Sequence, residues 1–166
     1  MGLNSNSDSM FLNVSCGKLI NKGKNIEARS FSGKILSIKQ VDDTYEEKTI
    51  HKIKVEISDG DESAIISFTE NSWYAKGFFQ RIHKADLTKE LVLGVSGSDK
   101  NEKISFCWMK QGDNVIKKDE SFVLPPKVEF NGEKVTDWGG WHERVADILG
   151  KLNYNGNDQI DDDLPF

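Results

Sequence analysis

Residues 51–57 restrict the fold of this chain more than any other stretch, because mostly apolar side chains alternate with charged ones along them. One set comprises His51, Ile53, Val55 and Ile57, and the other comprises Lys52, Lys54 and Glu56. A period of two places the sets on opposite faces of a β-strand, so that one face packs and the other meets solvent or a ligand. The Asp59-Gly60 step that follows suits the positive φ angles of a tight hairpin turn. We therefore predict antiparallel strands over residues 49–58 and 62–69.

Other stretches rich in Ile, Val and Phe, and bounded by Gly or Asp, predict further strands. They cover residues 10–20, 26–41, 90–96 and 102–110. An extended stretch over residues 121–130 contains Pro125-Pro126, which confines it to a sheet edge because proline cannot donate a ladder hydrogen bond. Residues 1–9 are polar, and we predict that they are flexible.

Two stretches have apolar residues at helical spacing. The first helix, over residues 71–86, has the apolar residues Trp73, Tyr74, Phe78, Phe79, Ile82 and Ala85, with Asn71 or Ser72 as its N-cap. We expect these rings to lie in the core, and a base-stacking role stays open. The second helix, over about residues 138–152, has the apolar stripe Trp141, Val145, Ile148, Leu149 and Leu152, with Thr136 or Asp137 as its N-cap. This helix either packs onto its own domain or forms a dimer contact.

Several short strands with one helix inserted late and another at the end predict a mainly β fold. The order fits the OB-fold, a small Greek-key β-barrel that binds oligonucleotides across one face, and a β-sandwich is the competing architecture. At 166 residues the chain can bury one sizeable core. We predict a flexible N-terminus over residues 1–9, one domain over residues 10–152 and a disordered acidic tail over residues 153–166.

Charge is distributed unevenly along the chain. Four aspartates follow Lys151, with no Lys or Arg among them, and they account for all but one of the five net negative charges. Self-repulsion and low hydrophobicity predict that this tail is extended and solvated. By contrast, residues 17–40 carry six Lys or Arg side chains against Glu27 alone. Such a local excess of positive charge can follow a phosphate backbone.

The chain ends in Asp161-Asp162-Asp163-Leu164-Pro165-Phe166, which offers an aromatic anchor, a free carboxylate and a negatively charged approach. Here the sequence resembles the single-stranded DNA-binding proteins (SSBs) of bacteria and their phages, whose acidic tip ends in the same pattern. The resemblance implies a protein that coats single-stranded DNA without sequence preference during DNA replication, recombination and repair. It also implies that these six residues recruit partner enzymes, in the cytoplasm of a bacterium or of a phage-infected host.

Binding of a single strand needs cations that replace the counterions of phosphate and flat rings on which bases stack. The predicted DNA-binding residues are Arg29, Phe31, Lys34, Lys39, Lys52, Lys54, Phe106, Trp108 and Lys110. Phe106, Trp108 and Lys110 share one face of their strand and form the best candidate for a stacking platform. An apolar core face fits the same pattern equally well.

Nothing in the sequence favours catalysis or a bound cofactor. It contains no P-loop, GxSxG or HExxH motif, and no CxxC or HxxxH spacing for zinc. We therefore expect a binding protein without cofactor or metal, and not an enzyme. Cys16 and Cys107 are predicted to be buried free thiols. No run of 18 apolar residues occurs, so we expect a soluble protein with no membrane partner.

A different class of function stays open. The domain could bind no nucleic acid and use the tip as an interaction module that captures or inhibits the enzymes that bind SSB tails. The two functions differ in whether the basic stretch and the ring-bearing strands form one continuous surface. The sequence also leaves a homo-oligomer open.

Overall fold

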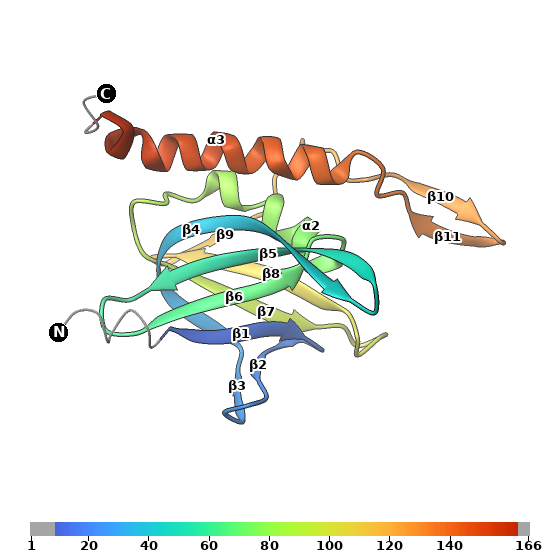
Figure 1. Ribbon diagram of the computed structural model, residues 1–166, viewed down its shortest axis with the longest axis horizontal. Coiled ribbons are helices and arrows are strands. Elements are labelled where there is room, and N and C mark those ends of the chain that lie inside the picture. The colour runs from blue at the N-terminus through green and yellow to red at the C-terminus, as the bar shows by residue number, and fades with distance from the viewer. Residues whose placement is uncertain (1–8, 163–166) are drawn as a thin grey trace.

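The computed structural model describes residues 9–162, with side chains for residues 9–152. The chain is mainly β, with a large mixed sheet and two helices (Figure 1). In chain order the elements are β1 (Met10–Ser15), β2 (Lys18–Asn21), β3 (Ile26–Ala28), β4 (Ser30–Tyr45), β5 (Lys48–Ser58), β6 (Ser63–Thr69), α2 (Trp73–Phe79), the 3-10 turn η1 (Ile82–Lys84), β7 (Leu91–Gly97), β8 (Ser105–Gln111), β9 (Asn114–Ile116), β10 (Lys127–Phe130), β11 (Glu133–Thr136) and α3 (Trp141–Asp162).

The large sheet has the strand order β3-β2-β1-β6-β5-β4-β7-β8-β9. β4 pairs with β5, and β5 pairs with β6, both antiparallel. The chain then returns through α2 to place β7 beside β4. The resulting order β7-β4-β5-β6 is a Greek key. β1 pairs with the free edge of β6 in parallel, which makes the sheet mixed. Within the described residues no ladder joins β8 back to β6 or β1, so these strands form no closed barrel, and the predicted OB-fold stays a prediction.

The bend in β4 divides this sheet into two layers. Residues 30–33 pair with β7, and residues 34–45 pair with β5. A register shift between Ile35 and Ser37 marks a β-bulge, and Leu36 is turned out to solvent. Gly33 is buried where the backbone of Ser58 approaches, and a Cβ there would lie 2.6 Å from the Ser58 carbonyl carbon. In Figure 1, β1, β6 and β5 form the front layer, while β7 and β8 pass behind them.

The core lies between these layers. Ile53, Val55 and Ile57 are fully buried, as the alternation in β5 predicts, and the Asp59-Gly60 turn joins β5 to an antiparallel β6. The inner residues of β7 and β8 meet them from the other side, and α2 fills the open end of the core with Tyr74 and Phe78. At the seam between β1 and β8, the Gly17 amide donates a hydrogen bond of 2.8 Å to Ser105 Oγ.

Several boundaries differ from the sequence prediction. Residues 10–20 form two strands and not one, because the chain turns at Cys16 and Gly17, whose φ angles are 50° and 78°. Cys16 is therefore exposed, while Cys107 is buried as predicted. β9 was not predicted. The strand predicted over residues 121–130 is shorter and pairs with β11 in a separate hairpin, so it is not an edge of the main sheet.

The helices also differ at their ends. α2 is capped by Ser72, as predicted, but it stops at Phe79 and is followed by the η1 turn. α3 begins after Gly140, which has a φ angle of 78°, and Asp137 accepts the Gly139 amide and caps no helix. α3 ends ten residues beyond Leu152, at Asp162, so the tail is not extended from residue 153. An established helix gains a backbone hydrogen bond for each added residue, and the first proline after Leu152 is Pro165.

The first turns of α3 pack onto the sheet of their own domain (Figure 1). Trp141 is buried, and its Nε1 donates a 3.0 Å hydrogen bond to the carbonyl oxygen of Glu70. The Glu70 carboxylate is itself buried, accepts a 2.6 Å hydrogen bond from Gln40 Nε2 and lies 2.9 Å from His142 Nδ1. Val145 and Leu149 are buried as well. Of the two roles left open for this helix, packing onto its own domain is therefore the one that the structure contains.

The close approach at Gly33 makes a stability prediction. Gly33→Ala should lower the free energy of unfolding by about 1–3 kcal/mol, because the new methyl group meets backbone atoms that cannot move independently. Gly150 is the matched control, since it lies within α3 with no atom within 4 Å of a Cβ placed there. Gly150→Ala should raise stability by about 0.5–1 kcal/mol. Urea unfolding of both variants tests this, and a Gly33→Ala protein as stable as the wild type would contradict it.

Candidate nucleic-acid interface

The outer face of the front layer carries polar and cationic side chains in register across four strands. Lys54 in β5 lies opposite Ser67 in β6 and opposite Lys39 in β4, and Ser67 in turn lies opposite Asn13 in β1. Residues directly opposite each other project from the same face of a sheet. Because Ile53 and Val55 fill the core, the row made by Asn13, Ser67, Lys54 and Lys39 faces outward. We call this surface the lysine face.

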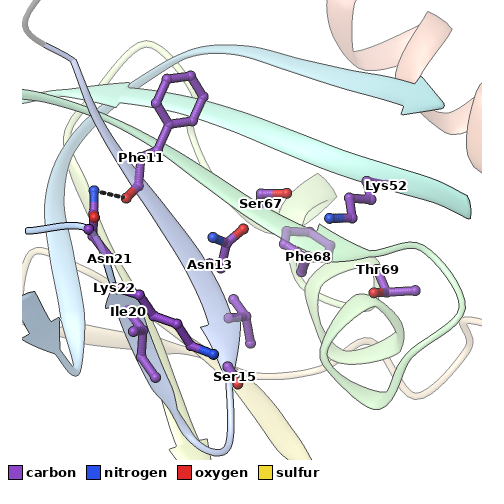
Figure 2. A pocket seen from close by; sticks show the side chains of 12 residues that line it. Phe11, Asn13, Ser15, Ile20, Asn21, Lys22, Lys52, Ser67, Phe68 and Thr69 are labelled. Atoms are coloured by element: carbon purple, nitrogen blue, oxygen red, sulfur yellow. Dashed lines mark hydrogen bonds between the residues drawn. The ribbon is translucent and has the colours of Figure 1, made fainter. Parts of the chain in front are cut away.

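A cavity of about 510 Å³ opens where the lysine face meets the β1–β2 hairpin. Figure 2 shows Asn13 and Ser67 between Lys22 on one side and Lys52 on the other. Asn21 is held in place by a 2.9 Å hydrogen bond from its Nδ2 to the carbonyl oxygen of Phe11. No Asp or Glu of the described residues lines this cavity. It therefore offers amide and hydroxyl groups between two cations, an arrangement suited to an anionic polymer.

Phe11 gives the lysine face an exposed ring. Its side chain is 53% exposed, and Lys54 Nζ lies 5.9 Å from the centre of its ring. Lys52 is only partly free, because its Nζ lies 3.3 Å from Asp43 Oδ2. An exposed ion pair of this kind contributes about 0–1 kcal/mol, so a phosphate can compete with Asp43 for Lys52.

The outer face of the rear layer carries a second set of candidates. Cys107 and Met109 are buried, so the stacking platform of Phe106, Trp108 and Lys110 lies on the outer face and not in the core. The indole of Trp108 lies flat across Gly94, where a Cβ would stand 2.0 Å from it. Its Nε1 donates a 3.3 Å hydrogen bond to the carbonyl oxygen of Val95. The missing side chain of Gly94 thus lets the ring rest on β7.

A cavity of about 460 Å³ separates this platform from α2. Trp73 lines it from α2 and is 39% exposed, so it is not the core residue that we expected. Its ring centre is 6.2 Å from that of Phe106, with an interplanar angle of 71°. Lys76, one helical turn further on, lies with its Nζ 4.0 Å from the Trp73 ring centre. We call this the α2–β8 cavity.

The nine predicted DNA-binding residues do not form one flat surface. Lys39, Lys52 and Lys54 lie on the lysine face, and Phe106, Trp108 and Lys110 lie on the opposite outer face. Arg29 lies just before β4 and Lys34 lies within it. Both are exposed, and neither lines the cavity of either surface. Phe31 packs against the core, because it lies opposite the buried Leu93 in β7. Phe31 is half-buried there, and its contact with DNA stays a prediction.

The nine predicted residues leave out several that line these cavities. They include Phe11, Asn13, Lys76 and Arg81, whereas Lys22 belongs to the basic stretch over residues 17–40. The prediction of a single strand over residues 10–20 hid Phe11 and Asn13, because it contains neither the alternation in β1 nor the β1–β2 turn. Lys76 was hidden because a lysine within an aromatic-rich helix ordinarily marks the solvent face, whereas here only 3% of the residue is exposed.

The predicted partner-binding tip, residues 161–166, lies mostly outside the described residues. Asp161 and Asp162 are the last two residues of α3, and nothing is described of their side chains. Asp163, Leu164, Pro165 and Phe166 lie outside the described residues. Recruitment of partners through the tip therefore stays a prediction.

Neither a metal site nor a membrane-spanning helix occurs in the described part of the chain. Among those residues, no group of three or more His, Cys, Asp or Glu side chains could hold a metal ion. No helix among them is long and apolar enough to cross a membrane. The cavities beside the lysine face and α2 thus remain the main candidates for function.

No protein-family model, no curated protein and no solved structure matches this chain. The resemblance to SSBs therefore stays where the sequence places it, in the last six residues. For the domain itself, the geometry and charge of its two outer faces are the evidence for function.

Asp119 directly follows Lys118, which lines the α2–β8 cavity, and the hydrogen bonds of its carboxylate lead to a pH prediction. Its Oδ1 accepts hydrogen bonds from Ser121 Oγ at 2.6 Å and from the Ser121 amide at 2.9 Å, while Oδ2 lies 2.7 Å from His83 Nε2. These bonds, above all that from the Ser121 hydroxyl, lower the pKa of Asp119 to about 2. A carboxyl whose pKa falls on folding stabilises the protein above its unfolded pKa, near 4, and loses this contribution as the pH drops toward 2.

Asp119→Asn should therefore lower stability at neutral pH and flatten its decline between about pH 4 and pH 2. Urea unfolding across this range measures both effects. Asp113→Asn, in the exposed β8–β9 turn, is the control and should follow the wild-type profile. Identical profiles for wild type and Asp119→Asn would show that Asp119 does not stabilise the fold.

Proposed function

We propose that this protein binds single-stranded DNA without sequence preference and recruits enzymes of DNA replication, recombination or repair through its C-terminal tip. The observation that carries the proposal is the lysine face, where an exposed ring and two lysines line a cavity that no carboxylate of the described residues lines. Binding of this kind needs no catalytic group, so we propose a binding protein and not an enzyme.

The charge on the lysine face supports contact with phosphate. The positive charges on or beside this face come from Lys22, Lys39, Lys52 and Lys54, and the negative charges come from Asp43 and Glu56. This local excess stands out in a chain with 27 Asp and Glu against 22 Lys and Arg. Neutralised phosphates release counterions, and this release supplies most of the sequence-independent affinity for nucleic acid. Stacking of a base on Phe11 would add about 1–3 kcal/mol, whatever the base is.

The topology supports an OB-type domain. The Greek key β7-β4-β5-β6 has α2 in its long connection, and β8 continues the sheet beyond β7. The OB-fold is a five-stranded Greek-key barrel that is partly open, and its second and third strands present the face that binds oligonucleotides. Counted from β4, the second and third strands are β5 and β6, which carry the lysine face. We therefore propose that β4–β8 form a divergent, open OB-fold extended by β1–β3.

The length of α3 supports a separate role for the tip in recruitment. α3 packs onto the domain from Trp141 to Leu152 and then continues for ten residues to Asp162. At 1.5 Å per residue, these ten residues extend about 15 Å beyond the contact. An acidic peptide with a terminal phenylalanine would then be available to a pocket with a basic rim.

DNA binding can be tested by fluorescence anisotropy of a labelled 20-nucleotide oligo-dT, with a matched duplex as the competitor. We expect affinity for the single strand that falls with salt. The double variant Lys52→Gln and Lys54→Gln should weaken binding and lower the salt slope by about 1.4, since each phosphate contact contributes about 0.7 for single strands.

The matched control carries the same change of charge elsewhere. Lys89 and Lys151 lie outside both surfaces and pair with Asp86 and Asp147. Changing both to Gln should leave the salt slope as in the wild type. Equal losses in the two double variants would show that only net charge matters, and no binding by the wild type would overturn the proposed DNA-binding function.

The tip can be tested with a synthetic peptide of residues 158–166. It should displace a labelled bacterial SSB tail peptide from a repair enzyme that binds such tails, and the same peptide with Phe166→Ala should not. If the peptide competes while the full protein binds no oligonucleotide, the chain is an interaction module that uses the tip without coating DNA. That second function is favoured by one observation, namely that the two candidate surfaces lie on opposite outer faces.

A further inference from the structure

A third cavity, of about 370 Å³, lies between the two candidate surfaces at the open seam of the sheet. It shares Val14, Ser15, Phe68 and Thr69 with the cavity of the lysine face. It also shares Trp73 with the α2–β8 cavity. The three cavities therefore adjoin one another, and they lead from one outer face to the other around the edge where β1 and β8 do not pair.

The charge along these three cavities has one sign. Their linings include six cationic side chains, namely Lys22, Lys52, Lys103, Lys76, Arg81 and Lys118. No Asp or Glu of the described residues lines any of them. The chain as a whole has more acidic than basic side chains, so a path free of carboxylates is not a consequence of composition. A continuous positive path with low-dielectric walls attracts anions, and its length matches the repeated charges of an anionic polymer.

Lys76 is the most unusual cation on this path. Only 3% of the residue is exposed, and no carboxylate of the described residues lies within ion-pairing distance of its Nζ. The ammonium group donates a 3.0 Å hydrogen bond to Thr136 Oγ1 and lies 4.0 Å and 5.0 Å from the ring centres of Trp73 and Trp138. Burial, and then the charge of Lys127, lower its pKa. A buried cation without an anion is unfavourable, and a phosphate in the cavity would relieve this.

The rings at this end of the path are arranged for flat ligands. Trp108 is fixed on Gly94 and presents its other face outward, while Trp73 and Phe106 are more than one third exposed. Exposed rings beside cations are the combination with which proteins hold single strands, because every base has a face that can stack. Trp73 already has two cations over its ring, with Lys76 Nζ at 4.0 Å and Lys127 Nζ at 4.8 Å from the ring centre, so a base that stacks there would lie beside both.

We propose that single-stranded DNA follows these three cavities around the open seam, from the lysine face to a second nucleotide subsite in the α2–β8 cavity. At this subsite a phosphate lies near Lys76 and Lys118, and a base stacks on Trp73 or Trp108. The proposal rests on the proposed function and extends it, since it joins two faces that would otherwise bind separately. A strand that follows the path contacts β1, the loop before β8 and α2 in turn.

Photo-crosslinking of the full-length protein to a 20-nucleotide oligo-dT with 5-iodo-deoxyuridine at single positions tests the path directly. We expect adducts in the peptide that contains Phe11 and also in the peptides that contain Trp73 or Trp108. Adducts confined to Phe11, together with unchanged binding by the variants below, would overturn the path and leave the proposed function intact. No binding to any oligonucleotide would overturn both.

Two pairs of lysines near each other in the sequence provide matched variants for the binding assay with the same oligonucleotide. Lys103 and Lys118 line the path, while Lys100 and Lys117 are exposed neighbours that do not. Lys103→Gln and Lys118→Gln should each lower the salt slope by about 0.7, and Lys100→Gln and Lys117→Gln should leave it unchanged. Equal slopes within each pair would count against the path.

The buried lysine needs a further control. Lys76→Gln should weaken binding to the 20-nucleotide strand, and thermal unfolding shows whether the variant is folded. If it is not, the exposed Lys118 variant and the crosslinks decide.

A labelled peptide of residues 158–166 is titrated in parallel. If that peptide binds and Lys76→Gln abolishes its binding without changing oligonucleotide affinity, the cavity holds the acidic tip of another copy and the nucleotide subsite is wrong.

Discussion

The bend in β4 is the constraint on which the rest of the structure depends. One strand pairs with β7 along its first four residues and with β5 along the remainder, so it belongs to both layers. The turn between them requires a residue without a side chain at Gly33, because the Ser58 backbone occupies the space of a Cβ. It also requires the bulge at Leu36, which shifts the register and increases the local twist. Without this bend the two layers would not face each other, and the apolar face of the sheet would be exposed to solvent.

The same bend determines what each outer face presents. Side chains alternate along a strand, so filling the core from β5 leaves Lys52 and Lys54 outside, and filling it from β8 leaves Phe106 and Trp108 outside. The two layers then turn a cationic face and an aromatic face away from each other. The two faces are connected at the seam between β1 and β8. No ladder of the described residues closes this seam, and the cavity there shares lining residues with the cavity of each face.

The lysines on these faces differ in what a ligand can gain from them. Lys52 is half-buried and paired with the more exposed Asp43, so binding a phosphate exchanges one weak contact for another and is sensitive to salt. Lys76 is already desolvated between two indoles, and salt screens a buried charge much less. A single strand held at both ends would combine a fast electrostatic encounter on the lysine face with a more durable contact at α2.

The sequence by itself determined the local features: the alternation in β5, the Asp59-Gly60 hairpin, the Ser72 cap and the apolar stripe of α3. Each depends on neighbours within a few residues, and local sterics and hydrogen bonding decide them. The tertiary structure alone decided that Phe31 packs against the core, that Trp73 lines a cavity and that six of the nine candidate residues divide between two faces. These outcomes depend on which strands pair across long separations and on a bend that one glycine permits, and no short window of sequence contains that information.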